Sequence, residues 1–394
     1  MSISLSRPLT LPCGAVLRNR IAKAATSEGL ASDHMLPTPR HAALYRRWAE
    51  GGAGLLLTGN VMIDERSRVA AGDVGVGNSR GVGAFVTWAR SVTDAGAHFW
   101  MQLNHPGRQT PRKLESKPVA PSAIRLKRGG FAFAEPRELA ESEILSLIDR
   151  FGQGAAFARE AGFTGVQLHG AHGYLISQFL SPRTNIRSDA WGGSPERRCR
   201  FLVEVLRSVR ARVGRDFPVG LKLNSRDFAR GGLSEDDSID VALTAQREGI
   251  DLLEISGGTY ENDIVLARRQ GVPAGEAYFG GSADKLRPRC SVPLMLTGGF
   301  RSGQAMEGAV DSNRADVVGL ARAIILVPDL PARLFGGQSI PPFRGPARFG
   351  IGLTDSAMEL SWYEEQIHRM ASGHAPDPAL GRASAFLRAL RRYA

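Results

Sequence analysis

Apolar runs of strand length recur along the whole chain. Eight of them, rich in Val, Ile, Leu and other apolar residues, occupy residues 20–26, 53–59, 97–103, 162–170, 217–224, 250–258, 292–299 and 315–324. Several are almost continuously apolar, which is typical of parallel strands buried on both faces of a sheet. The hydrophobic pattern therefore predicts eight parallel strands.

Helical patterns separate these runs. In residues 141–162, apolar side chains including Ile144, Leu145 and Ile148 recur at a spacing that predicts one buried helix face. A second helix is predicted after Ser194, a suitable N-cap, although Arg197 stands where a capping box prefers Glu or Gln. Strands that alternate with helices indicate an α/β fold.

The order of the elements favours a (β/α)8 TIM barrel over a doubly wound sheet, because nothing marks a reversal at the midpoint. We expect a barrel with an N-terminal cap over residues 1–335 and a C-terminal helical extension over 336–394, packed on the barrel. Three connections, 105–140, 171–193 and 259–290, are longer than simple links require. All follow strand ends, so they predict long loops at the C-terminal face.

Composition narrows the class of protein. The chain has 394 residues, is 43% hydrophobic and has no run near the ~20 apolar residues that span a bilayer, so we expect a cytoplasmic protein without membrane contact. Its net charge of +11 is dispersed, which favours a solvated basic surface over nucleic-acid binding. Three scattered cysteines indicate neither disulfides nor a cysteine metal cluster. The sequence is compatible with a homo-oligomer.

Polar residues and glycines gather where the predicted strands end. The carboxyl ends of barrel strands face one shared mouth, so their side chains should converge there. "TGGF" and "GLAR" place Gly298, Gly299 and Arg322 after strands seven and eight, where barrels commonly hold a phosphate. The glycine pair alone could be a tight turn. No Rossmann or Walker motif occurs, so a phosphate-bearing cofactor would lie across the barrel mouth.

The stretch "HGAHGY" places His169, His172 and Tyr174 at the end of the fourth predicted strand. The i, i+3 histidines could suggest a metal site, but no third ligand of suitable spacing is evident, and we expect no metal. Two histidines bound to backbone and an ordinary core tyrosine are the structural alternatives. The third possibility is an acid/base site.

The residues also resemble a known family. "LRNRIAKAATSEGLAS", "LLLTGNVM", "MQLNHPGRQ", "GVQLHGAHGYLISQFLSPRTNIRSDAWGGSPERRCRFL", "LEISGGTYE", "LTGGF" and "VVGLAR" are similar, in order, to the signatures of the Old Yellow Enzyme family. The resemblance implies an oxidoreductase with non-covalent FMN and with NADH or NADPH as co-substrate. It places cofactor contacts at Ala25, Thr26, Ser27, Gly59, Gln102, His169, Lys222, Gly298, Gly299, Ala321 and Arg322.

The resemblance also implies individual roles. Ser27 stands where relatives carry Thr or Cys beside the flavin C4 oxygen, and Gly59 where a small residue lets the ring approach the backbone. Gln102 matches the amide that binds the pyrimidine edge, and Lys222 the cation near N1 and O2. Gly298, Gly299 and Arg322 match the phosphate site.

In this family, the residues at positions 169 and 172 hold the oxygen of an α,β-unsaturated carbonyl or nitro substrate, and the tyrosine at 174 protonates the α-carbon. The resemblance therefore implies reduction of an activated C=C bond with ping-pong kinetics. Two alternatives remain: a flavin dehydrogenase or desaturase that runs in the oxidative direction, and a non-catalytic flavin-binding barrel.

The sequence departs from the family pattern at two places. Arg197 and Arg198 replace a frequent Asn-Arg pair, and Glu28 replaces an aromatic residue that some relatives carry next to position 27. Both changes concern the shape of the substrate pocket. No cysteine cluster follows the barrel, so the iron–sulfur branch of the family is disfavoured.

Overall fold

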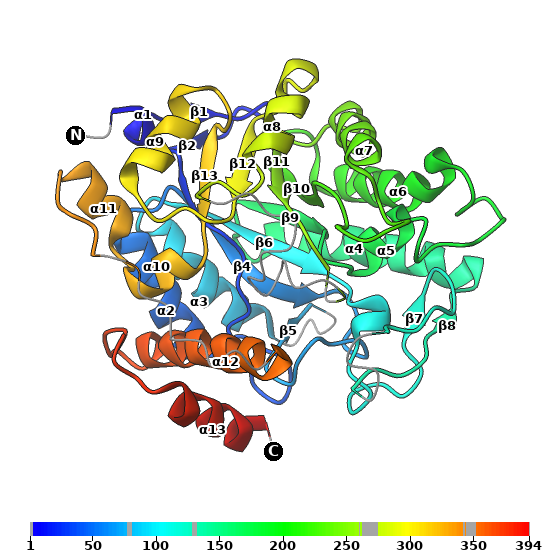
Figure 1. Ribbon diagram of the computed structural model, residues 1–394, viewed down its shortest axis with the longest axis horizontal. Helices are drawn as coiled ribbons and strands as arrows, with labels where there is room; N and C mark the ends of the chain where they lie inside the picture. Colours follow the sequence, from blue (N-terminus) through cyan, green and yellow to red (C-terminus); the bar gives the residue numbers. More distant parts are fainter. Residues whose placement is uncertain are drawn as a thin grey trace.

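The computed structural model describes residues 3–76, 81–127, 132–259, 261, 275–341, 343 and 352–393. Its centre is a closed barrel of eight parallel strands in chain order (Figure 1). The strands are β3 (Ile21–Lys23), β4 (Leu55–Met62), β6 (His98–Asn104), β9 (Gly165–Gly170), β10 (Val219–Asn224), β11 (Leu252–Ser256), β12 (Leu294–Thr297) and β13 (Val317–Leu320). The predicted (β/α)8 barrel is confirmed, and each predicted strand segment overlaps one of these strands.

Pairing of the first and last strands closes the barrel. Strand β3 is hydrogen-bonded to β13, with Gly319 opposite Ala22, and to β4, with Leu55 opposite Ala22. Shorter strands lie outside this ring: β1 (Leu9–Thr10), β2 (Val16–Leu17), β5 (Val74–Gly75), β7 (Val119–Ala120) and β8 (Arg137–Glu138). The β7–β8 pair lies within the long connection predicted over 105–140.

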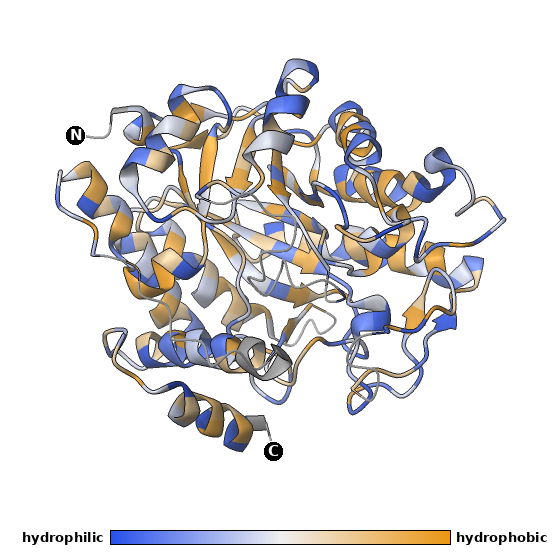
Figure 2. Cartoon of the chain, in the orientation of Figure 1, coloured by the Kyte–Doolittle hydropathy of each residue, from blue (hydrophilic) through white to orange (hydrophobic). Residues whose placement is uncertain are grey.

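Helices cover the outside of the barrel (Figure 1). They are α1 (Ile3–Ser6), α2 (Pro39–Glu50), α3 (Val82–Thr93), α4 (Glu141–Glu160), α5 (Leu175–Leu180), α6 (Pro195–Val213), α7 (Glu235–Arg247), α8 (Gly280–Leu286), α9 (Gly303–Asp311), α10 (Arg322–Leu326), α11 (Leu330–Phe335), α12 (Gly352–Ala371) and α13 (Arg382–Tyr393). Hydrophobic residues concentrate on the central strands and polar ones on the outer helices (Figure 2).

Two helices test the sequence predictions directly. Ser194 caps α6, its hydroxyl accepting a hydrogen bond from the Arg197 N–H, as the sequence indicates. The predicted buried face of α4 is wrong at Leu145, which is 53% exposed. Leu147 takes its place beside Ile144 and Ile148, since the side of α4 that packs on the barrel and α6 lies slightly further round the helix.

The floor of the barrel is apolar. Leu55, Trp100, Leu252, Met295 and Val317 point into it at alternate positions of their strands, and all are fully buried. Such inward layers fill TIM barrels. Leu11 and Leu17, from the segment that contains β1 and β2, pack against this layer from below. The reactive groups must therefore lie in the layers above it.

Helix α12 packs against α2 and α10 on the outside of the barrel, and α13 packs on α12 (Figure 1). Trp362 on α12 is fully buried, and its indole N–H donates to the Leu380 carbonyl at 2.8 Å. His368, also on α12, approaches the Glu28 carbonyl at 3.0 Å through Nε2. Helix α12 thus reaches the segment that follows β3. No helix among the described residues is long and apolar enough to cross a membrane.

Candidate active site

Above the apolar floor, the barrel contains a layer of polar side chains. Gln102, Gln167, Lys222 and Glu254 occupy the next inward positions of β6, β9, β10 and β11, and each is at most 3% exposed. Their spacing follows from the two-residue period of a strand, since Gln102 comes two residues after Trp100 and Glu254 two after Leu252. The predicted contact residues Gln102 and Lys222 therefore lie in one layer.

The next layer up carries the predicted catalytic group. The His169 ring lies with its centroid 4.7 Å from that of Tyr174 and 5.0 Å from that of His172, edge to face in both cases. His169 and Tyr174 are each 4% exposed. The structure thus brings together the three residues that the sequence singled out.

A second set of polar residues holds His172 in place. Its φ of 61° is in the left-handed region, which is uncommon for a residue with a side chain. The His172 N–H donates to Asn224 Oδ1 at 3.1 Å, and Asn224 Nδ2 donates to the Asp227 carboxylate at 3.2 Å. The ring Nε2 lies 2.9 Å from the Ser256 hydroxyl. These bonds fix both the backbone and the ring of His172.

Burial keeps both site histidines neutral. It lowers the pKa of His169 well below the usual range, and the neighbouring His172 and Lys222 lower it further. The pKa of His172 is also well below its usual range, through burial and then Lys222. His169 Nδ1 accepts a hydrogen bond from the Ala171 N–H at 3.2 Å, so the proton of the neutral ring resides on Nε2. His169 can therefore donate one hydrogen bond to a ligand.

The segment from Ala25 to Ser27 follows β3 at the barrel mouth. Ala25 and Thr26 are half-buried and Ser27 is exposed, with its hydroxyl 3.4 Å from the Asn60 amide nitrogen. The Thr26 hydroxyl oxygen is itself buried and has no hydrogen-bond partner within the described part of the chain.

Gly59 lies on β4 beside this segment. Its N–H donates to the buried Glu28 carboxylate at 2.8 Å. A Cβ at position 59 would lie 2.2 Å from Glu28 Oε2 and 2.7 Å from the Thr26 carbonyl oxygen, so only glycine fits. Glu28 also accepts a hydrogen bond from the Tyr45 hydroxyl, to which Lys23 Nζ donates at 3.1 Å. Burial lowers the pKa of Lys23 to about 7.

Gly298 and Gly299 follow β12 with φ values of 136° and 85°, which favour glycine. The Tyr278 ring lies against Gly299, where an added Cβ would come within 2.6 Å of it. Ala321 precedes α10, and Arg322 begins that helix. The Arg322 guanidinium is partly exposed and donates to Glu359 on α12 at 3.0 Å. The glycines thus lie at the predicted turn, and Arg322 contacts the C-terminal helix.

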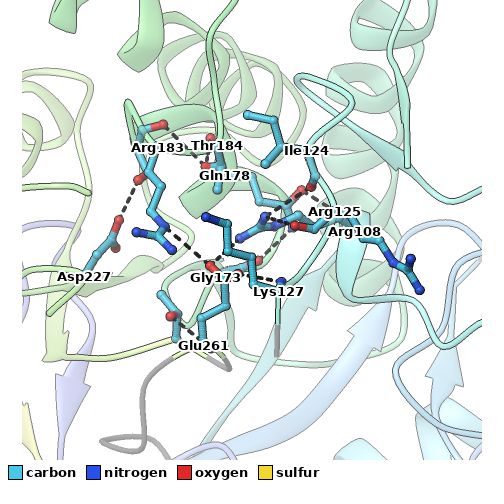
Figure 3. Close-up of polar contacts among 12 residues, drawn as sticks. Arg108, Ile124, Arg125, Lys127, Gly173, Gln178, Arg183, Thr184, Asp227 and Glu261 are labelled. Atoms are coloured by element: carbon cyan, nitrogen blue, oxygen red, sulfur yellow. Dashed lines mark hydrogen bonds and ion pairs between the residues drawn. The ribbon is translucent and has the colours of Figure 1, made fainter. Parts of the chain in front are cut away.

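A cluster of charges ties the loops together beside the site (Figure 3). The Arg108 guanidinium and the Glu261 carboxylate, 5% and 9% exposed, form an ion pair at 3.1 Å. Glu261 also accepts from the Lys127 N–H at 3.0 Å and lies 3.6 Å from Arg183 Nε. Burial raises the pKa of Glu261, but the Lys127 bond and the two arginines outweigh it and leave that pKa below its usual value.

Gln178 connects this cluster to the segment that contains Tyr174. Its amide nitrogen donates to the carbonyls of Gly173 at 2.7 Å and Pro106 at 3.0 Å, and its oxygen accepts from the Arg108 N–H at 3.3 Å. Within the described ranges, no group of three or more His, Cys, Asp or Glu is arranged to hold a metal ion.

The residues fit a flavin phosphate cofactor. An unpartnered Thr26 hydroxyl, a glycine turn at 298–299, and an amide and an ammonium in one buried layer supply donors for a phosphate and for a polar ring edge. The fold and the site together fit a TIM-barrel enzyme with a phosphate-bearing cofactor.

Comparison with known proteins identifies the family. Residues 4–339 match the sequence model of the NADH:flavin oxidoreductase / NADH oxidase family, and the chain belongs to it. The Old Yellow Enzyme resemblance is confirmed, and so are the oxidoreductase class, the FMN cofactor and the nicotinamide co-substrate.

Two fungal relatives are both named NADH-dependent flavin oxidoreductase iliE. The Neonectria protein is 41% identical over 92% of this chain, which spans only 51% of that relative's length. The Hypocrea jecorina protein is 39% identical over 83% of this chain and 87% of its own. Among solved structures, the old yellow enzyme homologue from Zymomonas mobilis superposes with a TM-score of 0.75 at 28% identity. That match covers 86% of this chain and 94% of the homologue.

Sequence reasoning missed three residues that support the site: Gln167, Glu254 and Asp227. Glu254 interrupts the apolar run 250–258, and a charged residue within a buried strand is a signal that could have found it. Gln167 interrupts the run 162–170 in the same way. Asp227 lies outside any predicted strand, and its sequence position carries no comparable signal.

Proposed function

We propose that this protein uses NAD(P)H to reduce the activated C=C bond of an α,β-unsaturated carbonyl or nitro compound, through FMN and with ping-pong kinetics. The observation that carries the proposal is the grouping of His169, His172 and Tyr174, which combines neutral imidazoles with a phenol. In the proposed complex these residues face the substrate, and Gln102, Lys222 and the 298–299 turn hold FMN.

The histidines polarise the substrate. His169 donates from Nε2 to the carbonyl or nitro oxygen, and His172, held by Ser256 and Asn224, supports the same oxygen. Hydrogen bonds aimed at this oxygen withdraw charge from the conjugated double bond, so its β-carbon becomes electrophilic. When bound, FMN takes a hydride from NAD(P)H and supplies it to that carbon.

Tyr174 supplies the proton. With lowered pKa values, the two histidines carry no acidic proton at neutral pH, whereas a phenol is still protonated there. Its position at the N-cap of α5 places Tyr174 directly beside the His169 ring. We therefore assign proton transfer to the α-carbon to the Tyr174 hydroxyl.

The comparisons support the reductive direction. The two fungal relatives carry names that specify NADH as reductant, and a morphinone reductase solved with tetrahydroNAD superposes with a TM-score of 0.72 at 25% identity, over 86% of this chain. We also propose that residues 1–335 form the catalytic barrel and that residues 336–394 form an extension packed on it. The Arg322–Glu359 and His368–Glu28 contacts support that division.

Replacement of Tyr174 by Phe tests the assignment. In Tyr174→Phe we expect NADH to reduce the bound FMN at the wild-type rate. Reoxidation of that FMN by an enone should slow by roughly 10²-fold or more, the usual contribution of a general acid. Stopped-flow absorbance measures the two half-reactions separately. Tyr363→Phe, on α12 beside Trp362, is the matched control and should change neither. Unchanged reoxidation in Tyr174→Phe would remove this residue from the mechanism.

A further inference from the structure

Four buried side chains form one continuous polar chain across the barrel. Gln102 Nε2 donates to Gln167 Oε1 at 2.7 Å, and Gln167 Nε2 donates to Glu254 Oε2 at 2.8 Å. The other oxygen of Glu254 forms an ion pair with Lys222 Nζ at 2.8 Å. The chain therefore starts at one residue proposed to contact the cofactor and ends at the other.

The charge of Glu254 determines the direction of every bond in this chain. An ionised carboxylate only accepts hydrogen bonds, so Gln167 must turn its NH2 group toward it. Its oxygen then faces Gln102, which must donate. Because the two ends of a glutamine amide have nearly the same shape, packing alone would not select this orientation. Glu254, which is fully buried, does so by charge.

This direction fixes what Gln102 can offer to a ligand. With one N–H committed to Gln167, Gln102 retains its carbonyl oxygen and a second N–H. The pyrimidine edge of a flavin alternates the acceptors O2 and O4 with the donor N3–H. An amide that presents one acceptor and one donor matches two adjacent groups of that edge, whereas an inverted amide would present two donors.

We propose that Glu254 is a positioning residue that sets the hydrogen-bonding direction of Gln102 and holds Lys222 in the same layer. The proposal rests on the function proposed above, which places Gln102 and Lys222 against FMN. Glu254 acts through Gln167 and need not touch the cofactor. It thereby couples the amide and the cation that face the cofactor.

Glu254→Gln inverts the chain in this account. The new amide should turn its oxygen toward the Lys222 ammonium and its NH2 toward Gln167. Gln167 then accepts from position 254 and donates to Gln102, so Gln102 presents both N–H groups to the cofactor. We expect the Kd for FMN to rise roughly tenfold, the effect of one mismatched hydrogen bond.

The double variant that combines Gln167→Glu with Glu254→Gln is the matched test. It keeps one carboxylate and nearly the same volume in the layer but moves the charge to position 167. The carboxylate introduced at position 167 would then accept from both Gln102 and the amide at position 254, which restores the wild-type direction of Gln102. The Kd for FMN should return to within about threefold of wild type, a difference smaller than half of the expected effect in free energy.

Titration of FMN into each apoprotein, followed by flavin fluorescence, measures these constants, and thermal melts show that each variant is folded. Wild-type affinity in Glu254→Gln, or a folded double variant that binds no better than Glu254→Gln, would overturn the proposal. If Glu254→Gln does not fold, the double variant alone decides, and a weak Kd in its folded form contradicts the proposal. Failure of the wild-type apoprotein to bind FMN would instead refute the proposed function.

Discussion

At the scale of single residues, two glycines make room for the largest side chain of the barrel floor. Trp100 is fully buried, and a Cβ at Gly165 or Gly220 would lie 2.5 Å or 3.0 Å from its indole. The indole is rigid and surrounded by the other floor residues, so it cannot yield to an added methyl group. The height of this floor within the barrel determines where the polar layer above it lies.

We expect Gly165→Ala to lower the free energy of unfolding by about 2 kcal/mol, as other overpacked cores do. Gly308→Ala is the control, because Gly308 is an exposed residue on α9 with open space around its Cβ position. That change should be neutral or slightly stabilising, since alanine favours a helix. Urea denaturation measures both, and equal effects at the two sites would contradict this view of the floor.

Polar residues of the barrel interior could be predicted from the sequence only where a strand end or a family signature marks them. His169, Gln102 and Lys222 were found because they lie at or near the ends of apolar runs or match a family signature. Glu254 was missed because its neighbours Leu253 and Ile255 are buried on the opposite face of β11. When both faces of a strand are apolar, the pattern does not show which face is interior.

At the scale of elements, the Arg108–Glu261 pair joins loops that follow different strands. Arg108 follows β6, and Glu261 follows β11, so a single buried ion pair connects two sides of the barrel mouth. Through Gln178, the same loop also contacts Gly173, next to Tyr174. The arrangement therefore connects the loops on both sides of the proposed catalytic residues.

Glu261→Ala leaves the buried Arg108 guanidinium without its carboxylate partner. We expect a loss of about 3 kcal/mol in the free energy of unfolding, because an unpaired buried charge is costly. Asp240→Ala is the control. The Asp240 and Arg289 side chains of this surface ion pair are 72% and 54% exposed, so the pair should contribute less than about 1 kcal/mol to the free energy of unfolding. Chemical denaturation compares them, and a similar small loss for both variants would show that the buried pair is not stabilising.

Long helices and strands were predicted better than short ones. The predicted helices over 141–162 and after Ser194 correspond to α4 and α6, because their periodic patterns extend over several turns. The two-residue strands β7 and β8 carry no periodicity that could reveal them. Much of the predicted long connection 259–290 lies outside the described residues.

At the scale of the whole molecule, buried histidines make stability depend on pH. Burial is the main cause of a lowered pKa in His41, His98, His105, His169, His172 and His368. The pKa of His41, His105 and His368 falls to about 4. An unfolded histidine titrates near ~6.5, so below that pH the unfolded chain binds protons that the folded protein does not.

The stability present above pH ~6.5 is therefore lost as the pH falls, by about 1 kcal/mol per histidine between pH 6.5 and 5.5. Asp73, whose pKa burial raises to about 7, and Asp227, whose pKa burial also raises, oppose this trend, because the folded protein keeps their protons where the unfolded chain loses them. Two such groups do not offset six. We expect a lower Tm at pH 5.5 than at pH 7.5 in the same salt, and a higher one would contradict the assignment of neutral histidines.

The order of the strands in the barrel and the end that carries the site could be predicted from the sequence, because eight similar apolar runs allow few topologies. The long-range contacts of the C-terminal helices could not be predicted from the sequence. The bonds of Arg322 to Glu359 and of His368 to the Glu28 carbonyl join positions more than thirty residues apart, and no periodic pattern encodes them. They connect the extension to both ends of the predicted cofactor site.

The central claim is that bound FMN transfers reducing equivalents from NAD(P)H to an activated double bond in this barrel. Anaerobic titration of the FMN-loaded protein, followed by its visible spectrum, tests it most directly. We predict that NADH or NADPH bleaches the oxidised flavin band and that one equivalent of cyclohexenone restores it without oxygen. A flavin that NAD(P)H does not reduce, or a reduced flavin that neither enone nor nitroalkene reoxidises, would contradict the account.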